Sequence, residues 1–393
     1  MRIAHIAPPW IAIPPKNYGG TEHMIFQLVE EQVAQGHEVT LLAPGDARTS
    51  ARQISFFLHS LRECDLPWHS HPKAFYHYYK SVEYLKEHSK DFDILHTHLS
   101  SATDLYLFPL TSTLRLPHVA TLHSQFPFDR AIGTDECKCA DHYYMQWISQ
   151  VPTVAISEHA KREETAKAPL HIIDVIHHGI NLRDFPKPDT GNPPENYFVW
   201  LGRLVPEKGA HLAIEAAQKA GVPLIIAGIV DEYVPAAKAY FEKRIKPHLD
   251  KKHISFIGPV DFKQRNALLH QARGLLNPLQ WEEPFGMVMI EAMATGCPVI
   301  AFPRGAVKEI ITSKSVGLLA NTVEEMVKCI ACIDSLDRYK VRKHIEEYFS
   351  SKGMAENYIH VYKKVIATQK RSLPAPITIT MPKNTTRPTT PRL

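Results

Sequence analysis

The sequence predicts an α/β protein with two doubly wound parallel-sheet domains that face each other across a cleft. The chain has 393 residues, which is more than one hydrophobic core usually serves. Two series of short apolar runs alternate with helical patterns, as in parallel sheets whose strands are joined by crossover helices. A polar, proline-rich segment over residues 187–197 separates the two series, so we expect it to be a linker.

The first series covers residues 1–186. It opens with an apolar run over residues 3–7 and a loop rich in proline and glycine. A helix pattern follows, with Thr21 as the expected N-cap. Further strands are expected over residues 38–43, 93–98, 118–123 and 152–157, and from residue 173 onward.

The second series, residues 198–350, restarts the alternation after the linker. From residue 323 onward the pattern is helical, and we expect a C-terminal helix over 351–371, for which packing against the first domain is an open option. Residues 372–393 are rich in threonine and proline, which is typical of a disordered tail. The strands expected in this series cover residues 198–203, 223–228, 254–258, 274–279 and 298–302.

Composition argues against several classes of protein. The chain is 44% hydrophobic and 22% charged, with a net charge of only +4, too small for the concentrated basic face of a nucleic-acid-binding protein. Six cysteines in this length indicate reduced thiols and not a disulfide framework. No apolar run approaches the roughly 20 residues of a spanning helix, and no export signal is recognisable. A cytoplasmic location is therefore expected, with peripheral contact to the inner face of a membrane left open.

Gly19 and Gly20 stand between the first loop and the first helix. Glycines there let backbone N–H groups and a helix N-terminus approach an anion closely, although a plain turn between strand and helix explains them equally well. The pair is not the GxGxxG fingerprint of dinucleotide-binding proteins, which argues against a nicotinamide-dependent dehydrogenase.

Two cations follow the first strand of the second series. Arg203 falls at the carboxyl end of that strand, the edge where open α/β sheets bind ligands. Lys208 lies next to the start of the following helix, where the helix dipole disfavours a cation unless an anion joins it. We expect the two side chains to clamp a diphosphate group. The alternative is a pair of solvated surface cations.

Two carboxylates, Glu283 and Glu291, flank the start of a later apolar helix. Glu283 lies in the loop after the strand over 274–279, again at the ligand edge, and Gly286 begins the helix. A carboxylate accepts two hydrogen bonds at once and so suits the neighbouring hydroxyl groups of a sugar or ribose. Helix capping is the alternative role of Glu283.

Histidines also mark the first domain. His96 and His98 are two residues apart in an expected strand, so their side chains lie on the same face. No third ligand is evident in the sequence, so no metal site is expected there. His123 ends the strand over 118–123, and a plain buried histidine is the alternative to a functional one.

Several motifs together resemble the retaining GT-B glycosyltransferases of family 4. They are YGGTEHM, DILHTH, TLHSQFP, AISEHAK, HHGINLRDF, GRLVPEKG and EEPFGMVMIEAMATGCPVIA. The resemblance runs in order from about residue 1 to residue 370, and the block that contains Glu283 and Glu291 is its most specific part. It implies the GT-B fold, in which two Rossmann-like domains face each other across the substrate cleft.

The resemblance implies a nucleotide diphosphate sugar as co-substrate, bound mainly by the second domain, with no metal or other cofactor. Arg203 and Lys208 would hold the diphosphate. Glu283 would contact the transferred sugar, and Glu291 the ribose. Further donor contacts are implied for Gly19, Gly20, Ile257, Gly258, Val260, Phe285, Gly286, Met287 and Val288.

On the acceptor side, His123 matches the histidine that the family places beside the reacting sugar. Ser124 follows it where the family often has aspartate, which leaves the acceptor contacts open. Phe126 and Phe128 are candidates for stacking on an acceptor sugar or lipid.

Arg304 replaces a family glycine and is expected to face solvent, which leaves Gly305 and Glu309 as the matching residues. The implied reaction is transfer of a hexosyl unit, with retention, to a sugar, lipid or small-molecule acceptor. A UDP-sugar is the default donor because it is common. The alternatives are a nucleotide-sugar epimerase or phosphorylase of the same architecture, or a non-catalytic nucleotide-sugar-binding protein.

Overall fold

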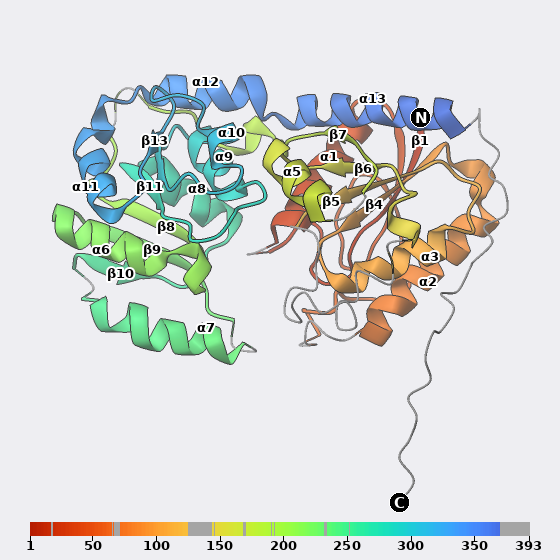
Figure 1. Ribbon diagram of the computed structural model, residues 1–393, viewed down its shortest axis with the longest axis horizontal. Helices are drawn as coiled ribbons and strands as arrows, with labels where there is room; N and C mark the ends of the chain where they lie inside the picture. Colours follow the sequence, from red (N-terminus) through yellow and green to blue (C-terminus); the bar gives the residue numbers. More distant parts are fainter. Residues whose placement is uncertain are drawn as a thin grey trace, which may run out of the picture.

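The structure is a computed structural model that describes residues 1–16, 19–64, 66, 71–124, 144, 146–167, 170–189, 191, 193–231, 234–250 and 252–369. Two sheets, of seven and six strands, form the centres of two domains (Figure 1). Every strand pairing in both sheets is parallel. The two doubly wound parallel sheets expected from the sequence are confirmed.

The first sheet has the order β3-β2-β1-β4-β5-β6-β7. The chain reverses its direction of travel between β1 and β4, and such a switch point is where open α/β sheets form a crevice for ligands. The strands are β1 (Arg2–Ile6), β2 (Glu38–Leu42), β3 (Arg52–Ile54), β4 (Ile94–Leu99), β5 (His118–Leu122), β6 (Thr153–Ala155) and β7 (Ile172–Val175).

The second sheet has the order β10-β9-β8-β11-β12-β13, with its switch point between β8 and β11. Its strands are β8 (Phe198–Arg203), β9 (Leu224–Ile229), β10 (Ile254–Phe256), β11 (Gly274–Asn277), β12 (Val299–Ala301) and β13 (Leu318–Leu319).

Helices cover both faces of each sheet (Figure 1). None of those in the described ranges combines the length and apolar character needed to cross a bilayer. The α-helices are α1 (Gly20–Ala34), α2 (His71–Glu87), α3 (Leu107–Thr111), α5 (Glu158–Lys167), α6 (Ala210–Ala220), α7 (Pro235–Tyr240), α8 (Phe262–Gln271), α9 (Met287–Ala294), α10 (Val307–Ile310), α11 (Val323–Cys332), α12 (Arg338–Tyr348) and α13 (Ser351–Gln369). Short helical turns are η1 (Ser89–Asp91), η2 (Ala102–Tyr106), η4 (Leu182–Asp184), η5 (Pro206–Lys208), η6 (Phe241–Ile245), η7 (Lys246–His248) and η8 (Ile333–Ser335).

The start of α1 corrects one expectation. The helix begins at Gly20 with Gly19 as N-cap, and Thr21 lies inside the first turn. Gly19 has φ 153°, and a Cβ there would lie 2.9 Å from both Pro15 and the carboxylate of Glu22. Close packing of the preceding loop on the helix therefore places the N-cap two residues earlier than the capping preference of threonine suggests.

The last helix, α13, returns to the first domain. Tyr358 and Tyr362 are buried in the same core as Ile3 of β1 and Ile25 of α1. In Figure 1, α12 lies over the second domain and α13 over the first, so the chain crosses between the domains a second time at residues 349–351.

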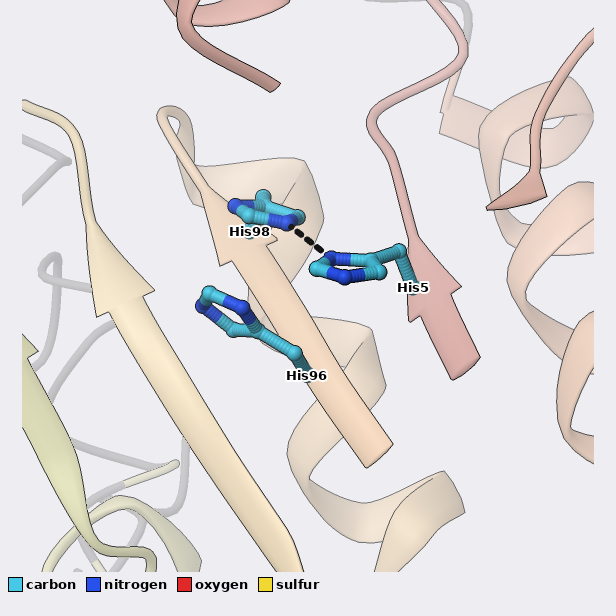
Figure 2. A group of neighbouring side chains, drawn as sticks. All are labelled: His5, His96 and His98. Atoms are coloured by element: carbon cyan, nitrogen blue, oxygen red, sulfur yellow. Dashed lines mark hydrogen bonds between the residues drawn. The ribbon is translucent and has the colours of Figure 1, made fainter. Parts of the chain in front are cut away.

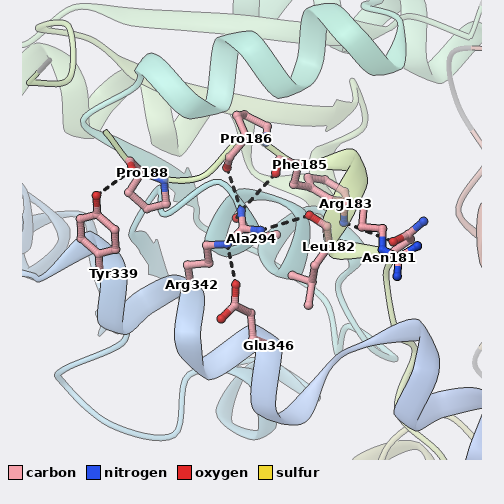
Figure 3. Close-up of polar contacts among 10 residues, drawn as sticks. All are labelled: Asn181, Leu182, Arg183, Phe185, Pro186, Pro188, Ala294, Tyr339, Arg342 and Glu346. Carbon is pink, nitrogen blue, oxygen red and sulfur yellow. Dashed lines mark hydrogen bonds and ion pairs between the residues drawn. The ribbon is translucent and has the colours of Figure 1, made fainter. Parts of the chain in front are cut away.

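Arg342 of α12 holds the first crossing in place. Its guanidinium group is buried and donates hydrogen bonds to four backbone carbonyls, and its Nε donates to Glu346 at 2.8 Å (Figure 3). Tyr339 of the same helix donates to the carbonyl of Pro188 at 2.9 Å. The segment that leaves the first domain is thereby fixed to the second. The four carbonyls belong to Leu182, Phe185, Pro186 and Ala294.

Candidate functional site

A cavity lies between the two domains at the carboxyl ends of their strands. Residues of both domains line it, because each doubly wound sheet presents its switch point at this edge. Polar side chains are contributed by Lys16, His23, Arg265 and Glu291. Backbone is contributed by Gly19, Gly20, Gly202 and Gly228.

Glu291 lines the cavity and is buried, with 4% of its surface exposed. Its Oε1 lies 3.1 Å from Nη2 of Arg265 on α8. Burial raises the pKa of the Glu291 carboxyl, and the neighbouring Arg265 lowers it in part. The guanidinium group thus favours the ionised form, which accepts hydrogen bonds from hydroxyl groups.

Arg265 is a cavity residue that the sequence analysis missed. It lies in the second turn of α8, the helix that follows β10, and its guanidinium carbon is 5.2 Å from the ring centroid of Phe262. Like Lys208, Arg265 is a cation near the start of a helix at the ligand edge, so the sequence carried a signal for it.

Lys208 and Glu283, for which the sequence suggested separate contacts, form one ion pair. Lys208 Nζ lies 2.5 Å from Glu283 Oε2, and Trp281 Nε1 donates to the same oxygen at 2.9 Å. The ammonium group also lies 4.6 Å from the ring centroid of Trp281. The indole and the carboxylate together fix the position of the cation at the end of η5.

Gly305 clamps the backbone around Glu283. Its φ is 64°, and a Cβ there would lie 2.1 Å from the carbonyl oxygen of Glu283. Gly305 N donates to Glu282 Oε2 at 2.6 Å, and Ala306 N donates to the Glu283 carbonyl at 2.9 Å. Only glycine permits this contact without strain. Arg304 faces solvent as expected, with 57% of its side chain exposed, and lies 3.7 Å from Glu282.

Glu309 joins the domains. Its carboxylate accepts hydrogen bonds from the backbone N–H groups of Glu158 and His159 at the start of α5, at 2.9 and 2.8 Å. It also lies 2.8 Å from His177 Nε2. A carboxylate from one domain therefore caps a helix of the other.

The remaining candidates fall in several places. Val260, Met287 and Val288 line the cavity. Arg203 directly follows Gly202, a lining residue, and is half-buried. The side chain of Phe285 lies instead in the core of the second domain.

Gly286 and Gly258 occupy positions that favour glycine. Gly286 is the N-cap of α9 with φ 115°. Gly258 has φ 76°, and its carbonyl accepts from Gly228 N at 2.9 Å. Ile257 beside it is half exposed.

His123 lies just after β5 and is buried. Its Nε2 is 3.0 Å from His98 Nδ1, and its ring centroid is 5.3 Å from that of His178. His178 in turn meets Phe285 edge-on at 4.9 Å. Ser124 follows His123 at the same edge, whereas Phe126 and Phe128 lie outside the described residues.

His96 and His98 do have a third histidine beside them, contrary to expectation. His5 of β1 lies next to β4, and one ring nitrogen from each of the three falls within 4.8 Å of the others (Figure 2). The sequence concealed this grouping because β1 and β4 are neighbours in the sheet but are separated by about 90 residues of chain.

Two family profiles match the chain in succession. The profile of Glycosyltransferase Family 4 matches residues 18–184, and that of Glycosyl transferases group 1 matches residues 183–349. The phosphatidyl-myo-inositol mannosyltransferase of Mycobacterium tuberculosis H37Rv is 26% identical over 377 residues, which cover 90% of this chain and 92% of that protein. The putative glycosyltransferase YtcC of Bacillus subtilis is 23% identical over 410 residues, which cover 96% and 95%.

Solved structures show the same architecture. Sucrose-phosphate synthase of Thermosynechococcus elongatus superposes with a TM-score of 0.71 at 19% identity, covering 94% of this chain and all of that one. Anabaena HepE in complex with UDP-glucose superposes with a TM-score of 0.69 at 16% identity, covering 93% and 100%. The expected GT-B fold is confirmed. With both profiles matched in order across the two domains, the chain belongs to the family 4, group 1 glycosyltransferases.

Proposed function

We propose that the protein transfers a hexosyl unit from a UDP-sugar to a sugar, lipid or small-molecule hydroxyl, with retention of anomeric configuration. The observation that carries the proposal is the cavity between the domains, with the Glu291–Arg265 pair on one side and Gly19 and Gly20 on the other. The complex of HepE with UDP-glucose and the mannosyltransferase relatives support a nucleotide-sugar donor.

In this proposal the second domain, residues 198–350, binds the donor and the first, residues 1–186, binds the acceptor, with residues 187–197 as the linker. The Glu291 carboxylate, which is paired with Arg265, accepts hydrogen bonds from the ribose hydroxyls. The loop of Glu283 contacts the transferred sugar, and His123 approaches it from the first domain.

Negative charge develops on the diphosphate as the bond between the anomeric carbon and the phosphate oxygen breaks. The acceptor oxygen bonds to the anomeric carbon from the same face, and its proton passes to the departing phosphate oxygen. No carboxylate nucleophile enters this scheme. Arg203, Lys208 and the backbone amides of residues 19 and 20 stabilise the developing charge, so the proposal assigns no role to a metal ion.

Arg203→Ala and Lys208→Ala test the clamp. Each variant is expected to lower kcat by at least about tenfold, since loss of one such donor typically costs about 10²–10³-fold. The measurement is the initial rate of UDP release and of glycoside formation with a panel of nucleotide sugars, and NMR of the product reports the anomeric configuration.

Lys219→Ala is the matched control, because Lys219 is an exposed cation of the same domain, paired with Glu215 and Glu324 on the surface. Its rate is expected to equal that of the wild type. Near-normal rates in both Arg203→Ala and Lys208→Ala would reject the clamp. UDP release without glycoside formation would contradict transfer itself.

A further inference from the structure

A row of buried polar side chains crosses the first sheet and ends at His123. His5 lies on β1, His98 on β4, and His123 just after β5, and these three strands are direct neighbours. His5 and His98 have no exposed surface, and His123 is 8% exposed. Figure 2 shows His5 and His98 joined by a hydrogen bond between their rings.

The hydrogen bonds form an unbroken series, here named the histidine chain: Gln32, His5, His98 and His123. Gln32 Oε1 on α1 lies 2.8 Å from His5 Nε2. His5 Nδ1 lies 3.0 Å from His98 Nε2, and His98 Nδ1 lies 3.0 Å from His123 Nε2. Gln32 Nε2 donates to the hydroxyl of Tyr362 on α13 at 3.1 Å, which sets the orientation of the amide.

Each imidazole of the chain is neutral at physiological pH. Burial lowers the pKa of His5 to about 4 and holds the pKa of His98 and of His123 well below the usual value. A neutral imidazole has one nitrogen that donates and one that accepts. If one ring nitrogen is a donor, the other must be an acceptor. The tautomer of each histidine therefore determines the tautomer of the next one in the chain.

The amide of Gln32 determines which nitrogen of each histidine donates a hydrogen bond and which accepts one. Its oxygen can only accept, so His5 carries its proton on Nε2 and accepts on Nδ1. His98 then donates from Nε2 and accepts on Nδ1, and His123 donates from Nε2. This leaves a lone pair on His123 Nδ1, an atom that is buried and has no hydrogen-bond partner among the described residues.

A metal ion fits the same histidines less well. His5, His96 and His98 have the spacing of a metal site, yet both ring nitrogens of each already have partners. Those of His96 are the hydroxyls of Tyr362 and Thr121, at 2.8 and 2.7 Å. A bound ion would have to break the bond between His5 and His98. The hydrogen-bond network uses all of these nitrogens without that loss.

We propose that Gln32 fixes, through His5 and His98, the tautomer of His123, so that His123 Nδ1 accepts a hydrogen bond from a hydroxyl group of the transferred sugar. His123 directly follows the carboxyl end of β5 and lies beside His178, whose ring contacts Phe285 in the loop before α9. Gln32, His5 and His98 are positioning residues, and only His123 touches the ligand. The identity of the ligand rests on the proposed function, whereas the tautomer does not.

The tautomer is measured by NMR of the full chain with ¹⁵N-labelled histidine, since protonated and unprotonated ring nitrogens have well-separated chemical shifts. The His123 signals are assigned by their loss in His123→Gln. In the wild type, Nε2 of His123 is expected to carry the proton. In Gln32→Met the oxygen acceptor is lost, so both tautomers are populated and the two nitrogen shifts converge. Gln32→Glu restores an oxygen beside His5 and is expected to restore the wild-type shifts.

His118→Gln is the matched control. His118 is a partly buried histidine of β5, and its Nε2 lies 2.8 Å from Thr97 Oγ1, outside the histidine chain. Its replacement is expected to leave the His123 shifts unchanged. Should Gln32→Met fail to fold, His5→Phe removes the next link while keeping a ring of similar shape.

A second arm measures kcat/KM with UDP-glucose and the other nucleotide sugars of the panel. Gln32→Met is expected to lower kcat/KM about tenfold, the loss typical of one hydrogen bond, and Gln32→Glu to recover it. An absence of turnover in the wild type would defeat the proposed function but not the tautomer relay, which the spectra decide. A proton on His123 Nδ1 in the wild type, His123 shifts indifferent to Gln32→Met, or one equivalent of metal in the purified protein would overturn the relay.

Discussion

At the scale of single residues, the carboxylate of Glu283 uses one of its two oxygens for its contacts with neighbouring side chains. The contacts it makes in the described part of the chain, from Lys208 and Trp281, fall on Oε2. Under the proposed function, Oε1 is the oxygen left for a hydroxyl of the donor sugar. The ion pair holds the Lys208 cation at the end of η5, and because both side chains are mostly buried, solvent screens the pair less than a surface salt bridge.

Glu291→Gln is expected to weaken UDP binding about tenfold while leaving kcat at saturating donor nearly unchanged. The amide offers one accepting oxygen where the carboxylate offers two, and a hydrogen bond to a charged group typically contributes about 1.5–3 kcal/mol. Isothermal titration calorimetry with UDP measures the change. Glu215→Gln, an exposed carboxylate paired with Lys219, serves as the control. Wild-type affinity in Glu291→Gln would remove its assigned ribose contact.

Some of these residues were recognisable in the sequence and others were not. Arg203, Glu283 and Glu291 stand in or beside strand and helix ends that local patterns reveal, so their place at the ligand edge could be predicted. His5 could not, because its significance comes from His98 on another strand, and one sequence carries no record of such contacts. Arg265 did carry a signal, its place near the start of a helix, but its pairing with Glu291 was not visible.

At the scale of elements, the strands with continuous apolar runs were predicted closely, and β8 matches its expected range residue for residue. The missed strands are β3, with three residues, and β13, with two. Both lie at sheet edges, where one neighbour suffices and partial exposure removes the apolar signal. The ion pair between Lys208 and Glu283 also depends on the arrangement of elements, because it joins the segment after β8 to the loop after β11.

Gly209 allows these two segments to lie close together. It joins η5 to α6 with φ 73°, and a Cβ there would lie 2.0 Å from the carbonyl oxygen of Pro278, in the loop that leads to Glu283. Gly209→Ala is expected to lower the free energy of unfolding by more than about 2 kcal/mol, from strain plus the clash, and to lower kcat by separating Lys208 from Glu283. Chemical denaturation and steady-state rates measure both.

Gly221 at the other end of α6 is the matched control, because it has nearly the same conformation, φ 66°, with no atom within 4 Å of a Cβ. Gly221→Ala is expected to cost only the strain of about 1–2 kcal/mol and to leave kcat unchanged. Equal effects of the two substitutions would show that the contact with Pro278 does not position the Lys208 loop.

At the scale of the whole molecule, the two domains are joined by more than a linker. Arg342 binds the first crossing, Glu309 caps α5 from the opposite domain, and α13 carries Tyr358 and Tyr362 back into the first core. The proline-rich composition of residues 187–197 indicated a boundary but gave no sign that α12 holds the preceding segment. That contact depends on the burial of Arg342, which the pattern of a charged helix does not reveal.

The stability of the whole molecule also depends on pH, because many histidines are buried as neutral rings. Burial lowers their pKa values, so the unfolded chain takes up protons below about pH 6.5 that the folded protein does not. Their contribution to stability is complete above pH 6.5 and is lost as pH falls from there toward the folded pKa values. The pKa is lowered to about 4 in His5, His23 and His77, to about 3 in His118 and His178, and well below the usual value in His96, His98 and His123.

Buried carboxyls act in the opposite direction but are fewer. Burial raises the pKa of Glu22 to about 7 and raises those of Asp104 and Glu291, so these groups favour the folded state as pH falls toward their unfolded values. Each group that titrates in only one state changes stability by about 1.4 kcal/mol per pH unit. The histidines therefore outweigh the carboxyls between pH 6.5 and 5.

We expect Tm to fall by at least about 10 °C between pH 7.5 and 5.0, measured by scanning calorimetry at constant ionic strength. His118→Gln removes one partly buried histidine with a lowered pKa, outside the histidine chain, so the pH dependence of the unfolding free energy should be shallower by about 1.4 kcal/mol per pH unit. A Tm that is equal or higher at pH 5.0 would mean that these rings are protonated in the folded protein. His123 would then have no lone pair on Nδ1 either, since a charged imidazole donates from both nitrogens.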